Sequence, residues 1–213
     1  KEWVFQYSYD DRNRMVAKQV TGAEAVYLVY DNRDRLVLTQ DGEQRKEHEW
    51  LFTKYDQFNR PVATGVYFDN VHIDLDVMQN YVNLNIGTGL IYSWFESIDL
   101  NNGVHYYDNA SFPNISDESK YLTITYYDNY QVAEDEWLIS YTPPALTNDF
   151  RGKTYTSEES RNSNVFGKVT ATKTKILETT SWIKHVIFYD EKYRVIQTHS
   201  DTYLGSTMGA EIY

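Results

Sequence analysis

Five Tyr-Asp pairs form the most regular grouping of chemically capable side chains in the sequence. In four of them an arginine follows the tyrosine by five residues, and the fifth pair lacks that arginine. These residues are Tyr9-Asp10 with Arg14, Tyr30-Asp31 with Arg35, Tyr55-Asp56 with Arg60, Tyr189-Asp190 with Arg194, and Tyr127-Asp128. A carboxylate beside a guanidinium could serve proton transfer, but one active site does not need five copies. The repetition therefore predicts a structural role.

Each copy has the composition of a β-hairpin. Upstream of the first pair, Trp3, Phe5, Tyr7 and Tyr9 alternate with other residues at the period of a strand. The polar centre of each copy is typical of a turn. The aspartate is expected to accept turn N–H groups, and the arginine to return on the opposite strand and pair with it. As an exposed ion pair, this contact would contribute about 0–1 kcal/mol.

Other chemistry has little support in the sequence. The five histidines lack metal-ligand spacing, and nucleophile-elbow, P-loop and dinucleotide motifs are absent. Paired carboxylates could hydrolyse glycosides, but runs such as Glu134–Glu136 are typical of a solvated face, and EF-hand spacing is missing. We therefore expect no catalytic residue, metal site or cofactor, and predict that the chain is not an enzyme.

Composition limits the partners. The formal charge of −11 and the pI of about 4.9 disfavour nucleic acid and anionic membranes. No apolar run approaches the roughly 18–20 residues of a membrane span, so we expect no membrane insertion. The absence of cysteine excludes disulfides. The start at Lys1, without an initiator methionine or signal peptide, is expected of a fragment of a longer chain.

The chain is predicted to be all-β. The 20 tyrosines, 9 phenylalanines and 5 tryptophans favour sheets with one hydrated face. We expect antiparallel hairpins that form a twisted, curved sheet, and one short helix in an insertion. The predicted segments are three hairpins in 1–66, an insertion in 67–120, a degenerate repeat in 121–140, a surface loop in 141–164 and a further hairpin region in 165–213.

The insertion is expected to hold a helix and a hairpin. Apolar residues from Ile73 to Leu84 fall at helical spacing, which predicts a helix over 74–82 with Asp74 capping or favouring its first turn. Residues 89–98 then return to strand character. Asn102-Gly103 is a hairpin-turn signal between two apolar runs.

The repeats resemble the YD repeats of bacterial Rhs (rearrangement hot spot) proteins. The resemblance covers residues 1–66 and 120–205 and is carried by "YSYDDRNRMVAKQV", "VYDNRDRLVLTQDG", "FTKYDQFNRPVATGVY" and "HVIFYDEKYRVIQTHSD". It implies a secreted or cell-surface protein whose sheet spirals around a hollow shell, often enclosing a toxic C-terminal domain. Partners would be the remaining repeats of the parent chain and an enclosed toxin domain or a cell-surface glycan. The chain is too short to close a shell and lacks the family's late core motif, so no self-cleaving aspartate is carried over.

A carbohydrate-binding or adhesion module is the alternative. Sugars stack on exposed aromatic rings, and the repeat pattern does not explain four aromatic residues of the insertion: Tyr92, Trp94, Tyr106 and Tyr107. These rings would form either a sugar-binding platform or part of a core. Unpaired strand edges at both ends of the sheet would also permit edge-mediated self-association.

Overall fold

The chain folds mainly as antiparallel strands, which confirms the predicted all-β class. The computed structural model describes residues 4–87, 91–142 and 161–201, together with the backbone of 209–212. These residues form two compact units, 1–123 and 124–213. The boundary between the units falls within strand β7 (Tyr121–Asp128).

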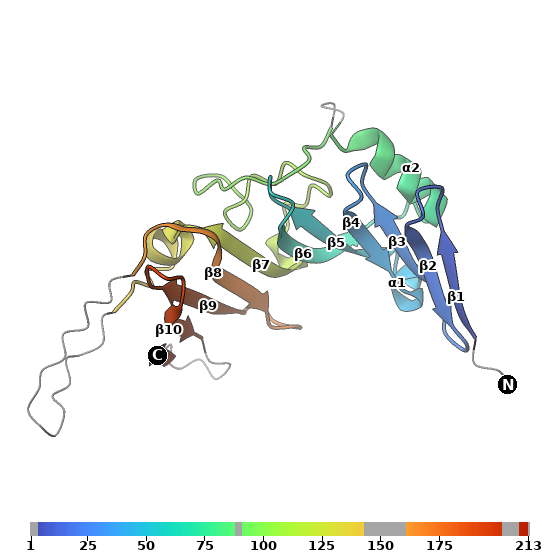
Figure 1. Cartoon of the computed structure of the whole chain (residues 1–213). Helices are drawn as coiled ribbons and strands as arrows, with labels where there is room; N and C mark the ends of the chain where they lie inside the picture. The colour runs from blue at the N-terminus through green and yellow to red at the C-terminus, as the bar shows by residue number, and fades with distance from the viewer. Residues whose placement is uncertain (1–3, 88–90, 143–160, 202–208, 213) are drawn as a thin grey trace, which may run out of the picture. The chain divides into compact units, whose positions relative to one another are not determined.

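The first unit is a meander of antiparallel strands in which sequence neighbours pair (Figure 1). Its strands are β1 (Phe5–Tyr9), β2 (Met15–Val20), β3 (Val26–Tyr30), β4 (Leu36–Gln40), β5 (Glu49–Tyr55) and β6 (Pro61–Phe68). A short helix, α1 (Gly42–Lys46), connects β4 to β5 and begins at a capping box, in which Asp41 accepts a hydrogen bond from the Gln44 N–H.

The core of the first unit lies on one face of β5. Alternate residues Trp50, Phe52 and Lys54 are at most 2 % exposed, as the period of two along a strand requires. Leu38 of β4 and Val62 of β6 are buried with them. One position of this inward row is therefore a lysine, a buried charge that was not predicted from the sequence.

Helix α2 (Leu75–Asn85) confirms the predicted helix but is longer than the predicted 74–82. Met78 and Val82 are fully buried, and the Gln79 side chain bonds both the N–H and the C=O of Tyr30 in β3. Asp74 occupies the N-cap position, but its side chain makes no capping hydrogen bond. Of the two roles expected for Asp74, the capping bond is therefore absent, whereas a carboxylate at the N-cap position still suits the helix dipole.

The expected strand over 89–98 does not form in its described part, 91–98. Backbone groups there bond different segments one at a time: the Tyr92 N–H donates to Asn85, Ser93 to Ala110 and Glu96 to Tyr55. Only isolated bridges result, because no two consecutive residues share one partner strand. The turn at Asn102-Gly103 is present, with the Gly103 N–H donating to the Asp99 C=O at 3.2 Å, but named strands do not flank it.

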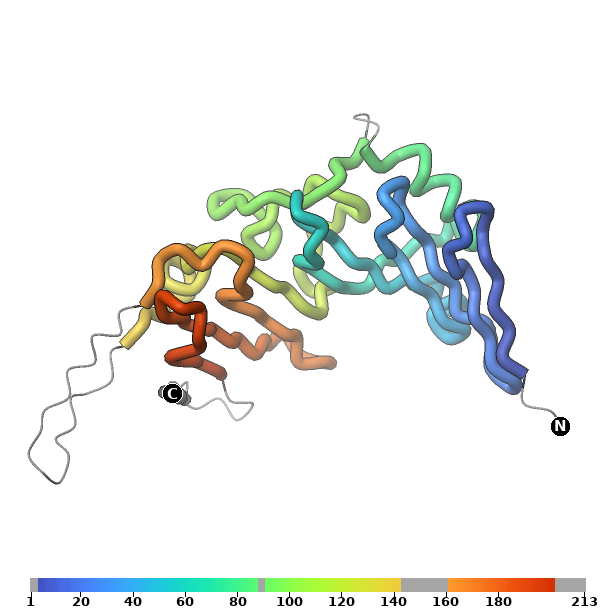
Figure 2. Tube along the Cα trace, viewed as in Figure 1, coloured from blue at the N-terminus to red at the C-terminus, as the bar shows by residue number. Residues whose placement is uncertain are grey.

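A 3₁₀ turn, η1 (Glu118–Lys120), leads into β7. The second unit continues with a π-helical turn, η2 (Val132–Glu136), and strands β8 (Val165–Lys175), β9 (Trp182–Tyr189), β10 (Val195–Ser200) and β11 (Gly209–Ile212). Strands β8 to β11 pair antiparallel in chain order, and Figure 2 shows the chain running through β8, β9 and β10. Val186 and Phe188 are fully buried, and Tyr130 packs 5.0 Å from the Phe188 ring. Most of the predicted surface loop 141–164 lies outside the described residues.

Candidate functional site

The four complete repeats close their hairpins in the same way. In the first copy the Asp10 N–H donates to the Arg14 C=O at 3.0 Å, and the Asn13 N–H donates to the Asp10 C=O at 2.9 Å. Asn13 has φ of 59°, and the equivalent residues of the other copies have values of 59–62°. This is the three-residue hairpin loop that ends in a left-handed residue. Three copies use Asn or Asp there, the side chains that tolerate that conformation best.

The aspartate of each complete copy fastens its own turn. One Asp31 carboxylate oxygen accepts the N–H groups of Arg33 and Arg35, both at 2.9 Å. The other accepts Nε of Arg35 at 2.7 Å and an Nη at 2.6 Å. Copies at Asp10, Asp56 and Asp190 repeat these contacts. The Asp–Arg contact is therefore present as predicted.

The expectation of an exposed ion pair is wrong for the second copy. Asp31 is fully buried and the Arg35 side chain is only 9 % exposed, whereas Arg194 in the fourth copy is 63 % exposed. Arg35 is covered by the insertion, whose Trp94 carbonyl accepts a bond from Nη2, and by the next repeat. The burial of each arginine depends on which other segment packs over its turn, and a local sequence repeat does not determine that.

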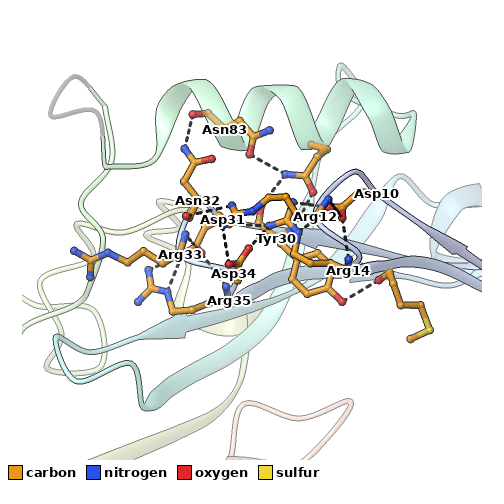
Figure 3. Close-up of polar contacts among 12 residues, drawn as sticks. Asp10, Arg12, Arg14, Tyr30, Asp31, Asn32, Arg33, Asp34, Arg35 and Asn83 are labelled. Carbon is orange, nitrogen blue, oxygen red and sulfur yellow. Dashed lines mark hydrogen bonds and ion pairs between the residues drawn. The ribbon is translucent and has the colours of Figure 1, made fainter.

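The tyrosine and arginine join neighbouring repeats (Figure 3). The Tyr30 hydroxyl donates to the Met15 C=O at 2.9 Å, and the Tyr55 hydroxyl donates to the Leu36 C=O at 2.8 Å. In each case the acceptor is the residue after the arginine of the preceding copy. That arginine also stacks on the same tyrosine, with Arg14 4.9 Å from the Tyr30 ring centroid and Arg35 4.8 Å from that of Tyr55.

The arginines also reach the left-handed residue of the next turn. Arg14 donates to the Asp34 carboxylate at 2.9 Å, and Arg35 to the Asn59 side-chain oxygen at 3.1 Å. These contacts, together with the tyrosine hydroxyl bond and the stacked guanidinium, are called the repeat link below. The repeat link was not predicted from the sequence, in which the constant five-residue interval between tyrosine and arginine is its only signal.

The degenerate repeat at Tyr127-Asp128 has its missing half later in the chain. Gly167, with φ of 81°, donates its N–H to the Asp128 carboxylate at 2.6 Å, 39 positions away. The Tyr189 hydroxyl donates to the Val169 C=O at 2.9 Å, as Tyr30 does to Met15. Gly167 therefore occupies the place of the left-handed turn residue, Lys168 that of the arginine and Val169 that of the next residue. The intervening segment is an insertion in the turn.

A buried polar cluster lies where the insertion meets β5. Its members are Lys54, Glu96, Asn109, Ser111 and Tyr121, all at most 7 % exposed. Nζ of Lys54 lies 2.8 Å from the Glu96 carboxylate and 2.5 Å from the Asn109 side-chain oxygen. Glu96 also accepts the Ser111 hydroxyl at 2.6 Å and the Ser111 N–H at 3.1 Å. The cluster fastens the insertion to the sheet by charge-assisted bonds.

Burial and charge act in opposite directions on the ionisable groups of this cluster. Burial lowers the pKa of Lys54, although the negative charge of Glu96 opposes the change. Burial alone would raise the pKa of Glu96, but Lys54 and the hydrogen bonds bring it below its ordinary value. The neighbouring Asp108 has its pKa raised to about 6 by burial and by Glu96.

The Asp108 shift predicts a pH dependence of stability. Because the folded pKa of about 6 exceeds the ordinary value of 3.8, the folded chain binds this proton more tightly, and ionisation of Asp108 lowers stability as pH rises between these values. Asp108→Asn cannot ionise, so its free energy of unfolding relative to the wild type should increase from pH 4 to pH 7. Urea denaturation of both proteins at these pH values measures the difference. A constant difference would contradict the assignment.

Comparison with protein-family models and with curated proteins finds no match to this chain.

The four aromatic residues of the insertion are engaged within the protein. Tyr107 is 6 % exposed, and the Tyr92 ring packs 5.1 Å from that of Phe112. Trp94 lies against Gly87, where a Cβ would stand 1.7 Å from the indole, and Arg33 stacks 4.6 Å from its ring. The fourth residue, Tyr106, is half-buried with φ of 64°.

Neither a metal centre nor a membrane-crossing helix is found in the described part of the chain. Groups of three or more His, Asp or Glu that could hold a metal ion are absent from these residues. Each of their helices is too short or too polar to cross a membrane.

Proposed function

We propose that this chain is a non-enzymatic structural segment of an exported bacterial Rhs/YD-repeat protein. It would form part of a β-sheet wall of the kind that encloses a toxin domain in that family. The observation that supports the proposal most directly is the repeat link, which recurs with the same atoms from the first to the second copy and from the second to the third. Contacts that repeat in this way build an extended sheet rather than a single site.

The exposed face of β1 supports further repeats as the partner. Tyr9 is 61 % exposed, whereas Tyr30 and Tyr55 are half-buried against the arginine of the copy before them. Phe5 and Tyr7 are 63 % and 53 % exposed on the same strand. Apolar rings beside an open strand edge are complementary to another hairpin of the same kind. Edge-mediated self-association of the isolated chain would use the same surface.

The contacts of the insertion favour the wall over a carbohydrate-binding module. A sugar needs an aromatic ring with one face free, but Arg33 covers a face of Trp94, and Gly87 lies directly against its indole. Tyr107 belongs to the core. Through its contact with Arg33, Trp94 holds the insertion against the turn of the second repeat, a task that a structural wall requires.

The same substitution at three copies tests the repeat link. Tyr30→Phe and Tyr55→Phe should each lower the free energy of unfolding of the first unit by about 1 kcal/mol, because a part-buried carbonyl loses its hydrogen bond. Tyr9→Phe should have no effect, because within the described residues no hairpin precedes Tyr9 to accept its hydroxyl. Hydrogen exchange of amides in β3 to β5 measures the first unit separately.

Joining one further hairpin upstream of β1 completes this test. A copy of residues 26–46 would supply an arginine for Tyr9 to contact and a carbonyl for its hydroxyl. Tyr9→Phe should then become destabilising, as at the other two copies. Equal effects at all three positions in the original chain, or none at Tyr30 and Tyr55, would contradict coupling between repeats.

A further inference from the structure

The buried cluster holds an amine, a carboxamide and a carboxylate in contact. Lys54 comes from β5, whereas Asn109 and Glu96 come from the insertion. Their exposed fractions are 2 %, 7 % and 2 %. The contact between Lys54 Nζ and the Asn109 oxygen, at 2.5 Å, lies below the usual 2.7–3.2 Å range of N–H···O bonds.

We propose that Lys54 and Asn109 are joined by an intramolecular isopeptide bond that the folded chain forms by itself, with Glu96 as the catalytic residue. The proposal does not depend on the proposed function, because it uses only the geometry of this cluster. It adds a covalent modification site and a single-turnover reaction to a chain otherwise assigned a structural role.

The geometry places the nucleophile near its target. The carbonyl carbon of Asn109 is one C=O bond, about 1.2 Å, from the side-chain oxygen, so Nζ lies at most about 3.7 Å from that carbon. Reacting atoms about 3–3.5 Å apart define a near-attack arrangement. A small movement of the lysine side chain is therefore enough for bond formation.

The oxygen that would gain negative charge already has hydrogen-bond donors. The Tyr121 hydroxyl lies 3.2 Å from the Asn109 side-chain oxygen, and the Ile115 N–H lies 3.3 Å from it. Attack on the carbonyl carbon moves an electron pair onto this oxygen. The Ile115 N–H, together with the Tyr121 hydroxyl when it turns toward this oxygen from the Ile115 C=O 3.0 Å away, stabilises that charge in the manner of an oxyanion hole.

The carboxylate of Glu96 is placed to move protons. It lies 2.8 Å from Nζ and first takes the ammonium proton, which leaves a neutral amine whose lone pair forms the Nζ–Cγ bond. Nδ2, which donates to the Asn114 side-chain oxygen at 3.1 Å, must then turn to take that proton from Glu96. Glu96 accepts a second proton from Nζ, while the Cγ–Nδ2 bond breaks and ammonia leaves. The products are one secondary amide, one ammonia and protonated Glu96, so atoms and charge balance without a further reactant.

Burial favours the neutral form of the Lys54 amine over its charged ammonium form. Desolvation disfavours the ammonium form and lowers the pKa of Lys54. Lys46 provides a contrast on the surface of the same unit, because its 57 % exposed side chain contacts Glu43, and pairing with that carboxylate raises its pKa. Lys54 thus combines a lowered pKa with a direct contact to a carboxamide.

The bond would join residues 55 positions apart in a chain that has no cysteine. It would tie the insertion covalently to the central strand β5. Like a disulfide, such a link restricts the unfolded chain most when the loop that it closes is long.

Intact mass spectrometry of the folded, purified chain tests the proposal. The wild type should be lighter than its sequence mass by one ammonia. A succinimide at Asn102-Gly103 would lose the same mass, so the site must be located by digestion. Trypsin does not cleave after an acylated lysine, and the peptide ending at Lys54 should therefore be absent, with the segments around residues 54 and 109 found as one species.

Three variants identify the roles of the residues. Lys54→Arg should retain the full sequence mass, and Glu96→Gln should retain it or lose ammonia far more slowly. Asn109→Asp should lose one water instead of one ammonia, because the leaving group changes. Lys46→Arg is the matched control and should show the same ammonia loss as the wild type.

The wild-type mass decides the question even if a variant fails to fold. A folded wild type at its full sequence mass, with the peptide ending at Lys54 released by trypsin, would overturn the proposal. Loss of ammonia that persists in Lys54→Arg would also overturn it, since the lost nitrogen would then come from another asparagine.

Discussion

Replacing Glu96 by alanine is expected to lower the free energy of unfolding of the first unit by about 3–5 kcal/mol, the range found when one partner of a buried ion pair is removed. Lys54 would keep its buried amine without the carboxylate that compensates it. Ser111 would lose the acceptor of both its hydroxyl and its N–H. Hydrogen exchange should show the loss in the β5 and β6 amides, whereas β9 amides of the second unit remain protected.

Two controls separate buried charge from other effects. Glu43→Ala removes a carboxylate that is 85 % exposed, and stability should hardly change. The double variant Lys54→Met, Glu96→Leu removes both charges and should be clearly more stable than Glu96→Ala. Neither of the Glu96 variants can form the proposed isopeptide bond, so the difference between them reports the unpaired lysine. If the double variant is no more stable than Glu96→Ala, the buried charge is not the cause.

Asp31→Ala should cost a similar amount, about 3–5 kcal/mol, because it leaves Arg35 largely buried without its partner. Two turn N–H groups also lose their acceptor. Arg35 would still stack on Tyr55, so the repeat link is weakened rather than abolished. Urea denaturation gives the loss, and retained β-sheet circular dichroism shows whether the variant still folds.

Asp190→Ala is the matched comparison in the fourth copy. Its contacts within the turn are the same, but the Arg194 side chain is 63 % exposed and can be hydrated when the aspartate is removed. The loss of stability in the second unit should therefore be clearly smaller than the loss that Asp31→Ala causes in the first. Equal losses would show that the turn bonds, rather than the burial of the arginine, determine the effect.

Local features of the fold could be predicted from the sequence. The hairpin turns and the Asp–Arg contacts follow from residues within five positions of one another, and their chemistry is the same wherever the copy occurs. The helix at Leu75–Asn85 was also predictable, because its apolar spacing is a local periodicity. Its true ends were not, since Asp74 contributes no capping bond and the last turn closes through the backbone bond from the Ile86 N–H to the Val82 C=O.

Features that depend on distant segments could not be predicted. Lys54 is a polar residue in an alternating strand, and only the position of Glu96 and Asn109 in the fold explains its burial. The repeat link was missed because it joins a tyrosine to the carbonyl of another copy. Gly167 and Asp128 could not be paired from the sequence, because the insertion between them hides the regular spacing.

The interrupted turn between Asp128 and Gly167 shows where this architecture accepts foreign sequence. A backbone N–H bond to the Asp128 carboxylate and the hydroxyl bond from Tyr189 are both present, although 38 residues separate Asp128 from Gly167, where two separate the equivalent residues of the complete copies; that count follows from the separation of 39 positions. Closing a longer loop costs little additional entropy, about 0.6 kcal/mol for each doubling of its length. A repeat turn is therefore a natural grafting point, and a peptide or small domain spliced into another turn would be displayed with the strands left in register.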